Sequence, residues 1–212
     1  MKKILISLLT TILIISCKTE ENKLITVNKN PLIQYYKVGK EVSISSSDFQ
    51  MGEENEFYEK GVTLILNGDF KGGETEFLKA LSINPNSIIA LNNLGNLKFM
   101  LREFPDAINY LNESIRLSDS TYFPAVLNLG RLYGLLGEDK KAEKLFNHII
   151  ENSEVDFLIG VSHFGLAQMY LDYGWIEKAK LSFSKSEFKL KSYSDFEPDL
   201  DTLKLEIENY NK

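Results

Sequence analysis

Cysteine, histidine and tryptophan are scarce in this 212-residue chain, which contains one Cys, two His and one Trp. The single Cys has no disulfide partner within the chain. The two histidines, His148 and His163, show neither H-E-x-x-H nor any other ligand spacing. The chain also has no G-x-S-x-G, phosphate-loop or G-x-G-x-x-G motif. We therefore expect no enzyme, no metal and no cofactor, and we expect both histidines to be packing or surface residues.

An excess of basic charge is also missing, since 24 Lys and Arg face 30 Asp and Glu, for a net charge of −6. Proteins that bind nucleic acid need a basic surface to neutralise phosphates, so we expect no nucleic-acid partner. The acidic clusters near 53–56 and 195–201 are interpreted as helix caps and solvated charge. The chain is long enough, and at 43% apolar residues it is apolar enough, to form the core of one domain with an appended tail.

Long apolar runs are absent except near the start, where residues 4–15 follow Lys2 and Lys3. This run is too short to cross a bilayer, which takes about 20 apolar residues, but it has the pattern of a signal peptide. Ser16 suits ordinary cleavage, whereas Ile14 does not. The stretch Ile14-Ile15-Ser16-Cys17 resembles a bacterial lipobox, which implies that 1–16 is a lipoprotein signal peptide and that Cys17 is lipidated. An uncleaved membrane anchor and a buried Cys are the alternatives.

The segment that follows the cysteine has no helical period. Lys18-Thr19-Glu20-Glu21 resembles a tag that directs some lipoproteins to the outer cell surface; a solvated charged tether is the alternative. Residues 17–50 are interpreted as a flexible or extended tether, the alternatives being a strand that pairs elsewhere or a segment lying in the domain's own groove. The expected location is the bacterial cell envelope, at the outer membrane rather than the inner one, with surface exposure left open.

The rest of the chain contains an internal repeat. Three columns of residues recur at steps of 34, 35 and 37: Gly61, Gly95, Gly130 and Ala167; Gly73, Ala107, Ala142 and Ala179; Phe77, Leu111, Phe146 and Phe183. Between the first two columns a turn position holds Gly68, Gly137 and Gly174, with Arg102 in the second copy. Small residues at a fixed register indicate two helices that cross closely, with the large residue filling the space beside the crossing.

Each copy is predicted to form a helix, a turn and a second helix. The first helices are expected at 54–66, 88–100, 123–135 and 160–172, and the second helices at 70–83, 104–117, 139–152 and 177–190. Pro85, Pro105 and Pro124 fall near the ends of these elements, where proline is tolerated.

This pattern resembles the tetratricopeptide repeat, a unit of 34 residues with the pattern W-x₂-L-G-x₂-Y…A-x₃-F…P. The second copy carries Leu91-x₂-Leu94-Gly95 followed by Ala107-x₃-Leu111, and the third carries Leu129-Gly130-x₂-Tyr133 followed by Ala142-x₃-Phe146. The first copy departs from it at Lys60, and the fourth has His163 at a large apolar position. The resemblance implies an all-α superhelix, a solenoid of about four hairpins that bury their faces on one another. The repeat domain is placed at 51–193, with repeats at about 54–87, 88–121, 123–156 and 160–193.

A solenoid also needs a polar cap on its last unit. Residues 194–212 follow the last repeat and carry Leu200, Leu203, Leu205, Ile207 and Tyr210. They are predicted to form a C-terminal capping helix, with Asp199 or Asp201 as its N-cap. A frayed tail is the alternative.

Members of this family bind peptides or proteins along a concave groove lined by the first helices. Carried onto this chain, the resemblance implies a partner-binding groove formed by Asn93, Asn96, Asn128, Arg131, Gln168, Tyr58 and Phe99. Amide side chains both donate and accept, which suits the backbone of an extended chain. Alternatively, Asn93 and Asn128 only form hydrogen bonds to neighbouring backbone within the solenoid. A clamp for a C-terminal carboxylate is disfavoured because Arg131 is the one basic residue in these columns.

The resulting hypothesis is a non-catalytic, lipid-anchored scaffold that holds a protein or peptide partner at the cell envelope. The alternative is an envelope lipoprotein that binds a small ligand or a glycan, although chains of that kind have long insertions between repeats that are missing here. An enzyme would need a constellation of catalytic residues that the sequence does not offer.

Overall fold

The computed structural model of this chain describes residues 52–210, and every regular element within them is a helix. The predicted signal peptide 1–16, the predicted lipidation site Cys17 and the predicted tether 17–50 lie outside the described residues. No helix among residues 52–210 combines the length and the apolar character needed to cross a membrane.

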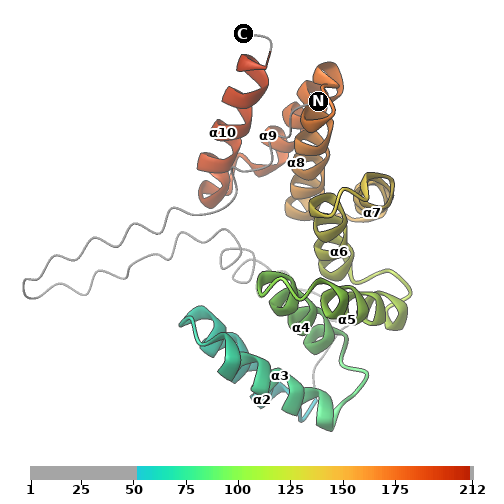
Figure 1. Ribbon diagram of the computed structural model, residues 1–212, viewed down its shortest axis with the longest axis vertical. Coiled ribbons are helices and arrows are strands. Elements are labelled where there is room, and N and C mark those ends of the chain that lie inside the picture. Colours follow the sequence, from blue (N-terminus) through green and yellow to red (C-terminus); the bar gives the residue numbers. More distant parts are fainter. Residues whose placement is uncertain (1–51, 211–212) are drawn as a thin grey trace, which may run out of the picture.

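Eight of the helices form four consecutive hairpins (Figure 1). They are α2 (Asn55–Leu66) with α3 (Phe70–Ile83), α4 (Ile88–Met100) with α5 (Phe104–Leu117), α6 (Phe123–Leu135) with α7 (Asp139–Asn152), and α8 (Asp156–Asp172) with α9 (Ile176–Leu190). Each hairpin packs on the next, through α3 on α4, α5 on α6 and α7 on α8. The predicted all-α solenoid of four helix–turn–helix units is confirmed.

The turn inside each hairpin has the same construction four times. Its central residue has positive φ, at 86° for Gly68, 62° for Arg102, 73° for Gly137 and 71° for Gly174. The backbone N–H one residue later donates back across the last helical turn, for example from Asp69 to the Leu64 carbonyl at 2.9 Å. This is a Schellman closure, which needs a left-handed residue and therefore favours glycine. The turn column found in the sequence thus marks the end of every first helix.

The small residues of the repeat lie where the two helices of a hairpin cross. Ala107, Ala142 and Ala179 are fully buried. A Cβ atom added to Gly61 would lie 2.7 Å from the Phe77 ring, and one added to Gly130 would lie 3.0 Å from the Phe146 ring. A larger side chain in these columns would therefore separate the helix axes.

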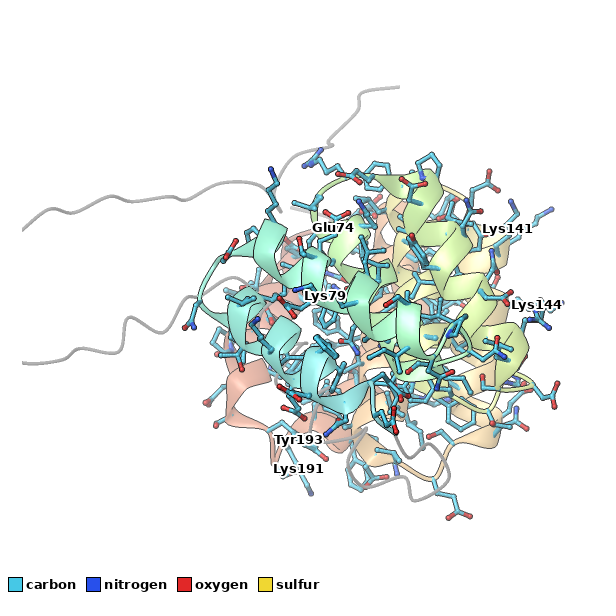
Figure 2. The ribbon with its side chains drawn as sticks, turned by 90° about the horizontal axis from the view of Figure 1, so that it is seen from below. Glu74, Lys79, Lys141, Lys144, Lys191 and Tyr193 are labelled. Carbon is cyan, nitrogen blue, oxygen red and sulfur yellow. The ribbon has the colours of Figure 1, made fainter. Side chains whose placement is uncertain are left out.

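First and second helices differ in how they are buried. In α4, 10 of 13 residues are buried, whereas α7 buries only Ala142, Phe146 and Ile149 along one stripe. The opposite face of α7 carries Lys141 and Lys144, which lie at the periphery of the molecule (Figure 2). Charged residues cover the solvent side of an amphipathic helix, so the second helices form the outer layer.

The stack curves because the first helices approach one another more closely than the second helices do. Helix α4 contacts α6, and α6 contacts α8, while successive second helices meet much less. The first helices therefore line the inner side of the curve, and α5 and α7 lie on its outer side (Figure 1).

Helix α8 begins at Asp156, four residues before the expected start at 160. The added turn carries Phe157, which is 3% exposed and whose ring lies 5.2 Å from Tyr193 and 5.4 Å from Phe196. The repeat pattern does not predict a helix at these positions. The extra turn is stabilised because Phe157 is buried against the segment that follows α9. The early start is thus a tertiary effect.

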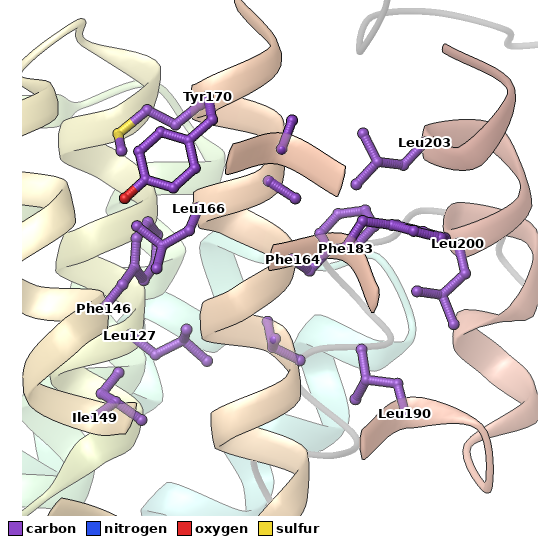
Figure 3. Close-up of a cluster of buried hydrophobic side chains, with 14 of the residues drawn as sticks. Leu127, Phe146, Ile149, Phe164, Leu166, Tyr170, Phe183, Leu190, Leu200 and Leu203 are labelled. Atoms are coloured by element: carbon purple, nitrogen blue, oxygen red, sulfur yellow. The ribbon is translucent and has the colours of Figure 1, made fainter. Parts of the chain in front are cut away.

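The C-terminal segment covers the last hairpin. A 3₁₀ turn (Ser194–Phe196) leads into α10 (Glu197–Asn209), whose Leu200, Leu203 and Ile207 are buried. Figure 3 shows Leu200 and Leu203 facing Phe164 and Phe183 of the α8–α9 hairpin. The predicted capping helix therefore forms, although Leu205 and Tyr210, expected on its apolar side, are 57% and 48% exposed.

The expected N-cap of α10 is wrong. The helix begins at Glu197, with Pro198 in its first turn, so Asp199 and Asp201 lie inside the helix. Proline is favoured in the first turn because the N–H that it lacks would have no helical partner there. The proline therefore fixes the start of α10, and neither aspartate caps it.

Candidate functional site

The residues expected to bind a partner come from four first helices. Tyr58 lies on α2; Asn93, Asn96 and Phe99 on α4; Asn128 and Arg131 on α6; and Gln168 on α8. Arg131 and Gln168 are partly exposed, and the other five are buried, at 4% exposure for Asn96 and 9% for Phe99. The name polar row is used for these seven residues together with Asn92 of α4, all on the inner helices, and Asp199 of α10.

The first link in the polar row joins α2 to α4. The Tyr58 hydroxyl has Asn93 as its hydrogen-bond partner, and Asn93 Nδ2 donates to the Ile89 carbonyl at 2.9 Å. Burial raises the pKa of Tyr58 well above its usual range, and the nearby Tyr122 and Glu59 raise it further. The phenol therefore stays protonated at neutral pH.

The second link joins α4 to α6. Asn128 Nδ2 donates to Asn92 Oδ1 at 3.0 Å, and these side chains are 8% and 5% exposed. Asn93 and Asn128 thus both make hydrogen bonds within the solenoid, but only Asn93 bonds to backbone, as the alternative interpretation supposed, whereas Asn128 bonds to a side chain. Asn92 was not among the expected site residues, although it is adjacent to Asn93 in the run Leu91-Asn92-Asn93-Leu94.

Asn96 differs from the other two amides. It is 4% exposed, and its Oδ1 has no hydrogen-bond partner among the described residues. A buried acceptor left without a donor costs about 1–3 kcal/mol, so this oxygen has an unused capacity to accept.

The third link involves Arg131 and reaches α10. Its guanidinium lies over the Phe99 ring at 5.7 Å, a cation–π contact between α6 and α4. Burial raises the pKa of the Asp199 carboxyl on α10, and the positive charge of Arg131 opposes part of this rise. Sequence reasoning found Arg131 but not Asp199, because nothing in the repeat pattern indicates where the cap places its carboxylates.

Neither histidine lies in the polar row. His148 Nε2 is 3.0 Å from the Ser120 carbonyl oxygen, and its ring packs near Phe123 at 5.8 Å. His163 is 8% exposed within the α8–α9 hairpin. Over residues 52–210, no three side chains of His, Cys, Asp or Glu gather in an arrangement that could hold a metal ion.

Residues 123–156 match the tetratricopeptide repeat family, and this match coincides with α6, α7 and the loop after them. A TPR repeat-containing protein of Methanocaldococcus jannaschii is 30% identical over 126 residues, which are 59% of this chain and 21% of that protein. The anaphase-promoting complex subunit CDC16 of Saccharomyces cerevisiae is 31% identical over 125 residues, 56% of this chain and 14% of the relative. The chain therefore spans only a small part of either curated relative.

Solved structures share the fold. PilW, described as a widely conserved type IV pilus biogenesis factor, superposes with a TM-score of 0.64 at 21% identity, over 86% of this chain and 84% of PilW. A tetratricopeptide repeat protein from Parabacteroides merdae gives 0.60 at 19% identity, over 87% and 71%. MamA gives 0.57 at 22% identity, over 74% and 87%. The chain thus carries a tetratricopeptide repeat at residues 123–156 and has the solenoid fold of tetratricopeptide-repeat proteins.

Proposed function

We propose that this protein is a non-catalytic, lipid-anchored scaffold that binds a protein partner at the bacterial cell envelope. The fold supports the first half, since a curved stack of hairpins presents a continuous inner face that an extended chain can follow. The name of CDC16 describes it as a subunit of a protein complex, which fits the same class of function. The signal-peptide pattern of residues 1–16 and the lipobox-like sequence that ends at Cys17 support the second half.

The observation that carries the binding proposal is the unpaired Oδ1 of Asn96 on the inner helix α4. The Asn96 side chain is enclosed in the unbound protein, so its oxygen accepts a hydrogen bond from the backbone N–H of an extended peptide only when the side chain turns towards the inner face on binding. The flanking Asn93 and Asn128 are held by hydrogen bonds to neighbouring groups, which fixes the rotamers around Asn96. These two side chains are ordered before binding and therefore lose little entropy when a peptide binds.

The chemistry of the polar row selects an internal peptide segment over a C-terminal carboxylate. Arg131 is the one cation among the expected groove residues, and its charge already acts on Asp199. A second carboxylate at this place would compete with Asp199 for the same guanidinium. The partner is therefore expected to contribute backbone amides and apolar side chains.

Co-purification from detergent-solubilised envelopes tests the binding half. The full chain is compared with Asn96→Ala and with the matched control Asn112→Ala, whose amide is exposed on α5. Asn96→Ala is expected to lower recovery of a stoichiometric protein partner about tenfold, the effect of roughly 1.4 kcal/mol. A thermal melt of each variant shows that the solenoid remains folded. Equal recovery with both variants, or recovery of a tight glycan or metabolite in place of a protein, contradicts the proposal.

Lipid attachment is tested separately at Cys17. Cells expressing the full chain are labelled with radioactive palmitate, and the mature N-terminus is read by mass spectrometry. The expected result is a lipidated Cys17 as the first residue and no label in Cys17→Ala. An intact Met1, or label that persists in Cys17→Ala, overturns the anchor and leaves the binding half unaffected.

A further inference from the structure

A cavity of about 440 Å³ opens on the α8–α9 hairpin. Its lining residues are His163 from α8 and Ser184, Lys185, Phe188 and Lys189 from α9. None of the residues of the polar row lines it, so it is separate from the proposed partner-binding face. Its volume is within the range of small-molecule sites, about 300–1,000 Å³.

His163 is the buried polar group of this cavity. It is 8% exposed, and its Nδ1 is enclosed without a hydrogen-bond partner among the described residues. Burial lowers the pKa of His163 to about 4, and the positive charges of Lys185 and Lys189 contribute. The ring is therefore neutral at pH 7. A neutral ring with no acceptor beside Nδ1 favours the tautomer with its proton on Nε2, which leaves an N–H to donate to a ligand.

Two ammonium groups give the cavity a positive charge. Lys189 pairs with Asp156 at 2.5 Å, so its charge is partly balanced. Lys185 forms no ion pair with any residue in the part of the chain that the structure describes, and it is exposed. Glu187, the acidic neighbour in sequence, is directed to Lys204 of α10, at 3.8 Å. The cavity thus holds one uncompensated cation.

We propose that this cavity binds the phosphate group of a phosphomonoester or of a lipid headgroup. Lys185, Lys189, Ser184 and His163 offer donors from both helices, and a phosphate has the three or more oxygens needed to accept from several donors at once, whereas a carboxylate has two. Lysine is a common phosphate ligand because it acts as a compact point charge.

The remaining wall of the cavity indicates that the phosphate carries an apolar group. Phe188, which lines the cavity, is 65% exposed, and Leu181, which lies two turns earlier on α9 and outside the lining, is 60% exposed. The cavity volume exceeds that of a bare phosphate ion. An aromatic or acyl group attached to the phosphate would cover Phe188 and remove part of the apolar surface of that side chain from water, which favours binding.

Nuclear magnetic resonance on the untagged protein gives a direct test, because the whole chain has only two histidines. Phenyl phosphate is titrated in while the imidazole signals of His163 and His148 are followed. The expected result is a saturable shift at His163 alone and a pKa that rises from about 4, because a bound anion between Lys185 and Lys189 stabilises the imidazolium. His148, held at the Ser120 carbonyl, serves as the internal control.

Matched lysine variants separate a defined site from general charge attraction. Lys185→Met keeps the aliphatic stem and removes the unpaired ammonium, and it is expected to weaken phenyl phosphate at least about tenfold. Lys180→Met, an exposed lysine of the same helix paired with Glu177 at 3.0 Å, is expected to leave binding unchanged. Equal weakening by both variants, or no response of His163 to the ligand, overturns the proposal.

Vesicle flotation distinguishes the two sources of the phosphate. Cys17→Ala and Cys17→Ala/Lys185→Met, which have no lipid at residue 17, are mixed with phosphatidic acid vesicles and with phosphatidylcholine vesicles, and inorganic phosphate is added as competitor. Flotation with phosphatidic acid that depends on Lys185 assigns a lipid headgroup. Binding of phenyl phosphate without flotation assigns a soluble phosphomonoester. Dependence on Lys185 in neither arm contradicts a phosphate site.

Discussion

A Cβ atom added to Gly95 of α4 would lie 2.8 Å from Cγ of Leu111 on α5 and 3.2 Å from the Leu111 backbone nitrogen. The two helices therefore touch at this point without room for a methyl group. Gly95 lies inside a helix, where glycine costs about 1 kcal/mol relative to alanine. The close crossing explains why the repeat retains it.

The first prediction is that Gly95→Ala destabilises the protein by about 1–3 kcal/mol, the usual cost of inserting a methyl group into a packed core. The control is Gly134→Ala on α6, where the nearest heavy atom, Ala142 Cβ, lies 4.0 Å from the added Cβ. That substitution is expected to stabilise by about 0.5–1 kcal/mol through helix propensity. Urea unfolding followed by circular dichroism measures both, and stabilisation by Gly95→Ala would contradict the crossing geometry.

Most helix positions could be predicted from the sequence because their signals are local. The positive-φ residues Gly68, Gly137 and Gly174 end the first helices by a closure that involves only neighbouring residues. The four-residue extension of α8 could not be predicted, because it depends on Phe157 packing against residues after α9. The start of α10 was also predicted wrongly. Asp199 is a residue type that favours the N-cap position, but Pro198 already lies in the first turn of the helix, which begins at Glu197.

For the candidate site, the sequence predicts which positions of the first helices the polar residues occupy, but it does not predict their hydrogen-bond partners. The repeat assigns Asn93, Asn96 and Asn128 to equivalent parts of the first helices. Whether an amide side chain forms a hydrogen bond to a neighbouring helix depends on how each hairpin is rotated relative to the next, and the packing of the hairpins sets that rotation. The Asn92–Asn128 hydrogen bond and the approach of Asp199 to Arg131 both arise in this way.

The second prediction concerns Arg102, which has a φ of 62° at the turn position where the other three units have glycine. A left-handed conformation costs a residue with a Cβ roughly 1–2 kcal/mol. Arg102→Gly is therefore expected to raise the free energy of unfolding by up to about 1 kcal/mol, since the more flexible unfolded chain offsets part of the gain. Chemical denaturation measures it.

The matched control for Arg102 is Gly137→Ala. The φ of Gly137 is 73°, and a Cβ there would meet nothing within 4 Å, so any change reports on the backbone alone. A loss of about 1 kcal/mol is expected. Unchanged stability in both variants would show that the turn conformation is not strained.

The third prediction concerns the hydrogen bond between Asn92 and Asn128. Asn128→Leu leaves Asn92 Oδ1 buried without its donor, at a cost of about 1–3 kcal/mol. In Asn92→Leu/Asn128→Leu both polar groups are replaced by apolar groups of similar size, so the loss is expected to be smaller than the sum of the two single losses. A double-mutant cycle in urea measures the coupling, and strict additivity would mean that the bond contributes nothing.

The fourth prediction concerns pH and the attachment of the cap. Burial and then Asp139 raise the pKa of Asp172 on α8, while burial and then Asp172 raise the pKa of Glu206 on α10. A carboxyl whose pKa is higher in the folded state than in the unfolded state binds its proton more tightly when folded. Its ionisation therefore costs stability above the folded pKa, and this cost disappears as the pH falls towards the unfolded value.

Glu206→Gln removes one of the two like charges between α8 and α10, so it is expected to raise the thermal midpoint at pH 7 by about 1–2 °C, because charge pairs between exposed residues such as these contribute under about 1 kcal/mol. The gain should vanish near pH 4, where Glu206 is protonated in the wild type as well. Glu208→Gln, an exposed neighbour on α10, is the control and should show no such pH-dependent gain. Thermal melts at both pH values measure the difference. A stabilisation by Glu206→Gln that is equally large at pH 4 would have to come from helix propensity, and the carboxylates would then play no part in how α10 covers the last hairpin.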